Sequence, residues 1–164
     1  MSDSTHFDLV IVGSGSGNSL VTPELESWRT AVVDRGVGSV GAFGGTCLNV
    51  GCIPTKMFVY AADVARTVAD AGRFGIDATL DGVRWRDVRD RVFGRIDPIS
   101  EGGRDYRVEA DHTEAYLGQA RFVGDRELEV EITRPGGHHE VGSLQRITGD
   151  QVVVATGSRP RVPD

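Results

Sequence analysis

A glycine-rich loop between two short apolar runs constrains the fold of this 164-residue chain more than any other feature. The first run is Phe7 to Val12, the loop is Gly13-Ser14-Gly15-Ser16-Gly17-Asn18, and the second run is Thr30 to Val33. Nearly continuous apolar runs of this length are typical of strands buried on both faces of a parallel sheet. We therefore predict an α/β fold that opens with a βαβ unit, whose helix follows the loop and is limited by Pro23.

The same segment predicts a nucleotide site. Gly13 permits a tight turn, Gly15 lets the backbone approach a pyrophosphate, and free amides at the start of the next helix face its charge. Asp34 closes the second strand, about 20 residues beyond the loop, where a carboxylate can accept hydrogen bonds from a ribose. Asn18 stands where the motif usually has its third glycine, so we expect the helix to lie slightly farther from the strand. A plain glycine-rich turn is the alternative interpretation.

Both cysteines and the only lysine of the chain lie between Cys47 and Lys56. Three interpretations are open for the cysteines: a redox dithiol, half of a metal site, or two inert buried thiols. The metal site is disfavoured because a third cysteine is absent and the four histidines show no matching spacing. We expect no metal.

Geometry favours the redox interpretation. On a regular helix, residues five apart are roughly 8 to 9 Å apart at Cα, whereas a disulfide needs less than about 7 Å. A bridge between Cys47 and Cys52 therefore requires a distorted backbone, and Asn49 and Gly51 tolerate unusual dihedral angles. Because Pro54 fits the first turn of a helix, the pair would lie at a helix N-terminus, where amide dipoles and the Lys56 ammonium favour the thiolate.

Composition and charge argue against several classes of protein. The net charge is −6 with acids and arginines interspersed, which disfavours binding to nucleic acid or anionic lipid. No apolar run approaches the roughly 18 residues of a membrane-spanning helix, and Met1 to His6 lacks the pattern of a secretory signal. Two cysteines without an export signal indicate the reducing cytoplasm, where a disulfide is more often catalytic than structural.

Two helices are predicted after the cysteines. Apolar residues at helical spacing indicate one helix from about Pro54 to Ala71 and a second from Trp85 to Asp97, followed by Pro98 and the Gly102-Gly103 pair. We interpret both apolar stripes as core that holds the cysteine-bearing helix in place.

The later part of the chain predicts strands separated by glycine-containing turns: Glu114 to Leu117, Arg121 to Val123, Glu127 to Ile132 and Gln151 to Ala155. The stretch Thr133 to Asp150 is expected to be an exposed hairpin connection, with His138 and His139 solvated. After the last strand, Ala155-Thr156-Gly157 and two prolines suggest a chain leaving one domain for another.

A family resemblance rests on three of these segments. The run Gly44-Gly45-Thr46-Cys47-Leu48-Asn49-Val50-Gly51-Cys52-Ile53-Pro54-Thr55-Lys56 resembles the active-site signature of the FAD-dependent pyridine nucleotide-disulfide oxidoreductases. The opening glycine loop and Ala155-Thr156-Gly157 resemble the two FAD-domain motifs of that family, in the same order. The resemblance implies a Rossmann-like βαβ FAD-binding domain with an inserted helical pair and a small antiparallel β-meander, incomplete relative to the family. Residues 1–164 would form its N-terminal part, including the helix of the redox-active disulfide.

The resemblance also implies a division of labour. NADPH reduces FAD, which passes the electron pair to the disulfide through Cys52; that thiolate then lies against the flavin as a charge-transfer donor. Cys47 attacks the substrate disulfide, and Lys56 stabilises the reduced flavin ring. The residues that would touch FAD are Gly13, Gly15, Ser16, Gly17, Asp34, Gly45, Thr46, Lys56, Ala120, Thr156 and Gly157.

Within the family, Gly13 to Ser19 and Lys56 to Ala62 resemble the branch that reduces mycothiol disulfide, with the lipoamide dehydrogenase branch as the alternative. Family members act on small disulfides as homodimers, and carry NAD(P)H-binding and dimerisation domains and an acid/base histidine that no histidine here matches. We therefore expect this chain to be a fragment that does not turn over alone, or a truncated flavin-binding module without catalytic function.

Overall fold

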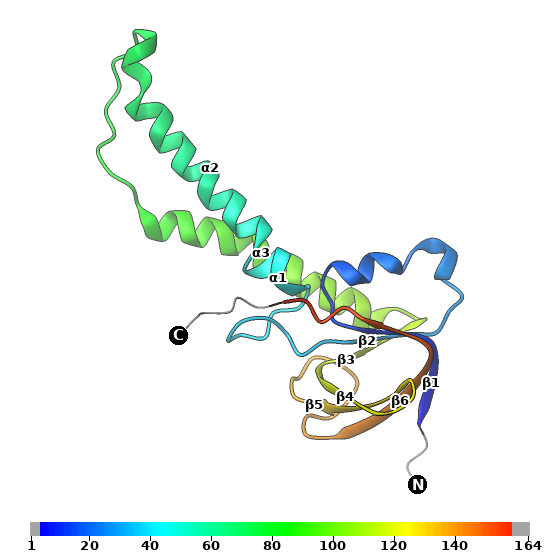
Figure 1. Cartoon of the computed structure of the whole chain (residues 1–164). Helices are drawn as coiled ribbons and strands as arrows, with labels where there is room; N and C mark the ends of the chain where they lie inside the picture. Colours follow the sequence, from blue (N-terminus) through cyan, green and yellow to red (C-terminus); the bar gives the residue numbers. More distant parts are fainter. Residues whose placement is uncertain (1–3, 159–164) are drawn as a thin grey trace, which may run out of the picture.

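The computed structural model describes residues 4–158 and contains one mixed sheet from which a pair of helices projects (Figure 1). The strands are β1 (Thr5–Val12), β2 (Thr30–Val33), β3 (Thr113–Tyr116), β4 (Gly118–Gly124), β5 (Glu127–Ile132) and β6 (Leu144–Val154). The α-helices are α1 (Gly45–Asn49), α2 (Cys52–Ala69) and α3 (Trp85–Glu109), and the 3₁₀ turns are η1 (Ser16–Leu20), η2 (Pro23–Leu25) and η3 (Ala71–Phe74).

The sheet has the strand order β3-β2-β1-β6-β5-β4. The pairs β3–β2, β2–β1 and β1–β6 are parallel, whereas β6–β5 and β5–β4 are antiparallel. This arrangement confirms the predicted α/β class, with a parallel centre and a small antiparallel meander. The two projecting helices α2 and α3 are the expected helical pair. The interpretation of the α2 stripe as core was wrong, because Tyr60 and Val64 are exposed and Pro54 is the one buried residue of that helix.

The main core cluster draws on all six strands, while Val32, Phe43 and Leu117 form a second cluster. Along β2 and β5 the members of the main cluster are two residues apart, as the period of two of a β-strand requires. The main cluster comprises Phe7, Val10, Ala31, Val33, Tyr116, Leu128, Val130, Ile132 and Ile147, with Val12, Ala120 and Val152 packed at their edge. Because every strand contributes to this cluster, the sheet curls around it and holds the strand ends in fixed relative positions.

The segment after the glycine loop departs from the prediction. In place of one α-helix, the chain forms the two short 3₁₀ turns η1 and η2. Pro23 occupies the first position of η2, where its missing N–H and its ring prevent a helix from continuing out of η1. The expected βαβ unit therefore has 3₁₀ turns in its crossover.

The second projecting helix is longer than predicted. α3 continues through Pro98 and the Gly102-Gly103 pair to Glu109, twelve residues beyond the predicted end at Asp97. Tertiary contacts explain the extension: Ile96 is buried on the near side of the proline, and the Ser100 hydroxyl donates a hydrogen bond of 2.7 Å to the Phe43 carbonyl on the far side. Packing outweighs the helix-breaking tendency of these residues.

The predicted hairpin connection at 133–150 was too long. β6 begins at Leu144, because its first half pairs with β5 on one side and with the start of β1 on the other. The expectation that both histidines of the connection are solvated was wrong for His139. Its ring stacks on Tyr116 at 4.5 Å between centroids, and its Nε2 lies 2.9 Å from a carboxylate oxygen of Glu114.

Candidate functional site

Three segments that carry predicted site residues meet at one edge of the sheet. Gly13 follows β1, Asp34 follows β2 and Ala155 follows β6, and β1 lies between the other two strands with parallel pairing on both sides. The carboxyl ends of the three strands are therefore neighbours. This edge is where open parallel sheets bind ligands.

The glycine loop packs here with no room for side chains at Gly13 and Gly17. A Cβ built on Gly13, whose φ is +116°, would lie 2.2 Å from the Ala155 carbonyl oxygen, and one on Gly17 would lie 2.3 Å from the Ala155 Cβ. On the other side of the loop, a Cβ on Gly45 would lie 2.6 Å from the Gly15 Cα. The loop is thus held between the segment after β6 and the first residue of α1.

The structural role of Asn18 differs from the one expected. The close approach of a third glycine is made by Gly17, against Ala155, while the Asn18 side-chain amide donates a 2.7 Å hydrogen bond back to the Gly13 carbonyl. Its Oδ1 is buried without a hydrogen-bond partner. Asn18 therefore closes the loop on itself, which fixes the backbone of the residues predicted to face a pyrophosphate.

Buried polar groups fix the start of the cysteine segment. The Gly44 amide donates a 2.7 Å hydrogen bond to the Ser14 hydroxyl, and the Asn49 side chain donates to the carbonyls of Phe43 (2.8 Å) and Gly45 (2.9 Å). The Phe43 carbonyl also accepts the hydrogen bond from Ser100. The sequence prediction that Asn49 supplies an unusual dihedral angle was wrong, because Asn49 is the last residue of α1 and acts through its side chain. Ser14 and Ser100 had no predicted role, because short polar residues of this kind are frequent in exposed turns as well.

The backbone between the cysteines has the break that their spacing requires. Cys47 lies in α1 and Cys52 is the first residue of α2, and the chain leaves helical geometry at Val50 and Gly51. A Cβ on Gly51 would lie 2.9 Å from the Thr46 carbonyl oxygen and 3.4 Å from the Cys47 Cα. Glycine at this position lets the start of α2 press against α1, so that Cys52 lies near enough to Cys47 to interact with it.

The cysteines are present as free thiols, Cys47 half-buried and Cys52 exposed. A hydrogen bond with the Cys52 side chain raises the pKa of Cys47, and burial and repulsion by a negative charge on Cys52 raise it further. For Cys47, this direction is opposite to the expectation that the surroundings favour the thiolate. Lys56 lies one helical turn beyond Cys52 on α2, with its side chain exposed.

Asp34 is buried at the end of β2 and its Oδ2 is occupied. This oxygen accepts hydrogen bonds from the Gly36 amide (3.1 Å) and from the Arg134 guanidinium (3.3 Å). Among residues 4–158, no group donates to its Oδ1. One carboxylate oxygen thus remains for a ligand such as a ribose hydroxyl.

The remaining predicted contacts are distributed over several elements. Ser16 is exposed at the start of η1, Thr46 is exposed in α1, and Thr156 and Gly157 are exposed directly after β6, beside the glycine loop. Ala120 lies in β4 opposite Val130 of β5, with its side chain packed at the edge of the core.

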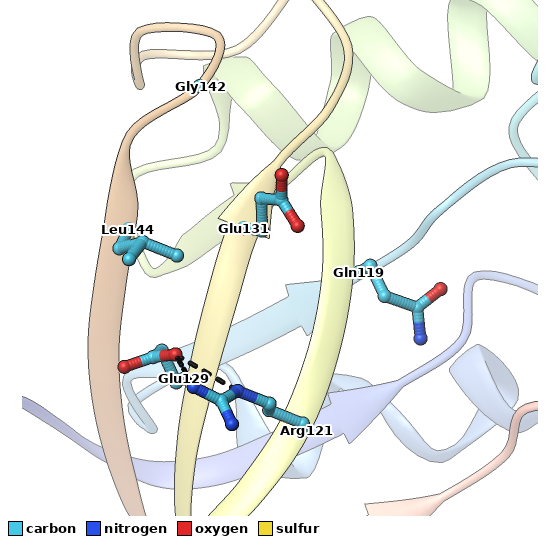
Figure 2. A pocket seen from close by; sticks show the side chains of 6 residues that line it. All are labelled: Gln119, Arg121, Glu129, Glu131, Gly142 and Leu144. Atoms are coloured by element: carbon cyan, nitrogen blue, oxygen red, sulfur yellow. Dashed lines mark hydrogen bonds and ion pairs between the residues drawn. The ribbon is translucent and has the colours of Figure 1, made fainter.

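A hollow of about 450 Å³ lies away from these segments, on the outer face of the meander. Figure 2 shows the Arg121 side chain reaching across it to Glu129, with Gln119, Glu131, Gly142 and Leu144 around it. The Arg121 Nε donates to Glu129 at 3.0 Å, so these two charged groups of the hollow already pair with each other. The hollow contains no thiol and none of the predicted site residues.

Within the described residues, no group of three or more His, Cys, Asp or Glu side chains is arranged as metal ligands would be. No helix in the described part is long and apolar enough to cross a membrane.

Comparisons with known proteins match nearly the whole chain. A profile of the pyridine nucleotide-disulphide oxidoreductases covers residues 7–164. A mycothione reductase of Mycobacterium tuberculosis is 48% identical over 157 residues, which are 96% of this chain and 32% of that protein. A dihydrolipoyl dehydrogenase of Bacillus subtilis is 30% identical over 163 residues (96% and 33%), and a trypanothione reductase of Trypanosoma congolense is 29% identical over 165 residues (95% and 33%).

The chain spans about a third of the length of the curated relatives it matches. The matched part includes the glycine loop, both cysteines and the segment after β6, which the fold brings to one edge of the sheet. The matched family consists of flavin-dependent disulfide oxidoreductases that use FAD and NAD(P)H. The chain belongs to the pyridine nucleotide-disulphide oxidoreductases.

Proposed function

We propose that this chain is the N-terminal part of the FAD-binding domain of a disulfide reductase that acts on mycothiol disulfide with NADPH. The observation that carries the proposal is the contact between Gly15 of the glycine loop and Gly45 of the cysteine segment, at the carboxyl ends of the parallel strands. It joins a nucleotide-binding motif directly to a dithiol. The 48% identity to a mycothione reductase supports the choice of substrate.

The residues at this edge fit FAD. The glycine loop is held between Ala155 and Gly45, and its partly exposed backbone suits a pyrophosphate. Asp34 has an oxygen free for the ribose of the adenosine half. We propose that the following residues hold the cofactor: Gly13, Gly15, Ser16, Gly17, Asp34, Gly45, Thr46, Lys56, Ala120, Thr156 and Gly157. Bound FAD would supply a two-electron carrier between NADPH and the cysteines.

The cysteines carry the exchange with substrate. The Cys47 thiolate attacks one sulfur of the substrate disulfide, forming a mixed disulfide while the other half leaves as a thiolate and takes up a proton. The Cys52 thiolate then attacks the Cys47 sulfur, which forms the Cys47–Cys52 disulfide and releases the second thiol. The closeness of Cys52 to Cys47, which raises the pKa of Cys47, supports the second step, because the two thiols lie near enough to interact.

Lys56 is proposed to place its ammonium near the flavin ring, where a positive charge stabilises the reduced anionic form. Its position one turn after Cys52 on the same helix supports this role, since residues four apart lie on one face. The full-length protein is proposed to be a cytoplasmic homodimer, as the family resemblance implies.

A lipoamide dehydrogenase-like activity is the second candidate, favoured by the 30% identity to a dihydrolipoyl dehydrogenase. The two candidates use the same dithiol and differ in the disulfide that is exchanged.

The test has two steps. Titration of the chain with FAD, followed by calorimetry and by the visible flavin spectrum, is expected to show binding. The reduced chain is then mixed with mycothiol disulfide or with lipoamide, and thiol release is measured. One equivalent of mycothiol disulfide consumed per chain, faster than lipoamide, supports the proposal. The variants Cys47→Ala and Cys52→Ala control for each thiol.

Dithionite reduction of the FAD-loaded chain distinguishes a catalytic dithiol from a flavin-binding module without function. A catalytic dithiol should give a long-wavelength absorption band that is absent in Cys52→Ala. Failure to bind FAD would contradict the proposal altogether. Faster exchange with lipoamide would favour the second candidate.

A further inference from the structure

Arg134 connects the meander to the end of β2, where the predicted nucleotide site lies, through a partly buried guanidinium. It follows β5, and its backbone amide donates a 3.1 Å hydrogen bond to the Leu117 carbonyl. Its side chain, 19% exposed, reaches the end of β2 and donates to the Asp34 carbonyl at 2.7 Å and to the Asp34 carboxylate at 3.3 Å. It also donates to the Gly41 carbonyl. No sequence motif pointed to this residue.

The guanidinium lies against a tight hairpin between Asp34 and the cysteines. Val37 and Ala42 exchange two backbone hydrogen bonds of 2.9 Å across it. Gly41, with φ +66°, has no space for a side chain, because a Cβ there would lie 2.7 Å from the Arg134 Cδ. The same arginine therefore holds both the carboxylate after β2 and the chain that leads onward to α1.

The charges of the pair are largely removed from water. Asp34 is 8% exposed at its side chain, and burial lowers the pKa of Arg134, partly offset by the neighbouring carboxylate. The Arg134 Nε is buried without a hydrogen-bond partner. Water stabilises these charges less than it stabilises exposed ones. Removing one partner therefore leaves the other as a buried charge without compensation.

We infer that Arg134 is a positioning residue for the nucleotide site: it engages Asp34 through Oδ2 and so leaves Oδ1 as the acceptor for a ribose hydroxyl. This inference rests on the proposed binding of FAD. A carboxylate oxygen held in this way is preorganised, since the ligand need not order the side chain when it binds. Arg134 acts through Asp34 and need not contact the ligand.

The inference predicts a specific loss of ribose recognition. A hydrogen bond to a charged acceptor contributes about tenfold or more to affinity. We expect the wild-type chain to bind ADP about tenfold more tightly than 2′-deoxy-ADP, and Arg134→Met to bind the two within about twofold of each other. FAD affinity should fall by a similar factor in the variant.

The experiment measures dissociation constants of FAD, ADP and 2′-deoxy-ADP by calorimetry for wild type, Arg134→Met, Asp34→Asn and the double variant. Arg121→Met is the matched control, because Arg121 is also ion-paired but is 72% exposed on the outer face of the meander. Its discrimination between the two nucleotides should equal that of wild type. The effects of the two single variants at Arg134 and Asp34 should not add in the double variant.

Arg134→Lys keeps the positive charge and is the variant to measure if Arg134→Met does not fold. A lysine has its donors on one nitrogen and lacks the planar fork by which Arg134 reaches Gly41 from Nη1 and Asp34 from Nη2, so discrimination should still fall. If a folded Arg134 variant still distinguishes ADP from 2′-deoxy-ADP as well as wild type does, the inference about Arg134 is overturned. The proposed function still stands in that case, provided that wild type binds FAD. If wild type binds no FAD, both are overturned.

Discussion

Gly15 and Gly45 lie against each other so closely that Gly45 has no room for a side chain: a Cβ on Gly45 would lie 2.6 Å from the Gly15 Cα. They belong to segments 30 residues apart, the glycine loop after β1 and the start of α1. Through this contact the glycine loop, at the carboxyl ends of the parallel strands, and the segment that carries the cysteine pair form one structural unit. Several measurable consequences follow from this arrangement and from the groups around it.

Gly45→Ala should separate the two segments. The φ of +75° at this position disfavours alanine, and the new methyl group would overlap the Gly15 Cα. We expect a loss of about 1–3 kcal/mol in the free energy of unfolding from strain alone, measured by urea titration, with a parallel loss of FAD affinity. Gly102→Ala is the control, since open space surrounds that exposed helical glycine; it should gain about 0.5–1 kcal/mol. Equal stability of Gly45→Ala and wild type would contradict the contact.

Gly51→Ala should act on the disulfide more than on the fold. The added Cβ would press on the Thr46 carbonyl oxygen at 2.9 Å and on the Cys47 Cα at 3.4 Å. A strain of about 1 kcal/mol changes an equilibrium about fivefold. In redox titrations against dithiothreitol, the variant should therefore favour the dithiol about fivefold over wild type. An unchanged potential would show that Gly51 is not needed to bring the sulfurs together.

Cys52→Ala should lower the pKa of Cys47. The hydrogen bond and the repulsion that raise the Cys47 pKa both come from Cys52, so their removal increases the thiolate fraction at a given pH. Alkylation of Cys47 by iodoacetamide, followed by mass spectrometry from pH 7 to 10, should reach half its maximal rate at a lower pH in the variant. Coincident profiles of the two proteins would rule out this coupling.

Tyr116 should make the fold sensitive to alkali. Burial, followed by the nearby Glu114 carboxylate, raises the pKa of its phenol well above the ordinary value, which is about 10. Above that pH the unfolded chain loses this proton while the folded chain keeps it, so stability falls as pH rises. Urea titrations between pH 8 and pH 11 should show a decline that is smaller in Tyr116→Phe. Parallel curves for both proteins would exclude the phenol as its source.

Pro98→Ala should stabilise α3. Pro98 lies exposed in the middle of this helix and cannot donate to the carbonyl four residues earlier. Alanine restores that hydrogen bond and removes the ring, with a gain of up to about 3 kcal/mol. Arg95→Ala, on the same exposed helix, should stay within about 0.5 kcal/mol of wild type. A loss of stability in Pro98→Ala would instead show that the proline directs Ser100 toward the Phe43 carbonyl.

Much of the candidate site could be predicted from the sequence because its motifs are local. The apolar run before Gly13 and the acid at Asp34 each follow from a few adjacent residues, and so does the start of a helix near Pro54. The same holds for the requirement that the backbone break between Cys47 and Cys52, which is a matter of helix geometry.

Two of the errors share one physical origin, which is packing between distant segments. α3 passes through Pro98 because Ser100 finds a buried acceptor in Phe43, and His139 is sequestered because Tyr116 offers it a ring face. Local propensity contains neither contact, and packing outweighs propensity when many atoms are buried.

The sequence by itself determined the α/β class, the nucleotide loop and the dithiol, since each depends on residue types at short spacing. Only the tertiary structure decided that Gly15 meets Gly45 and that Arg134, a hundred residues along the chain from Asp34, holds that carboxylate. Such pairings depend on how the sheet curls around its core, and the curl arises from the summed packing of all six strands.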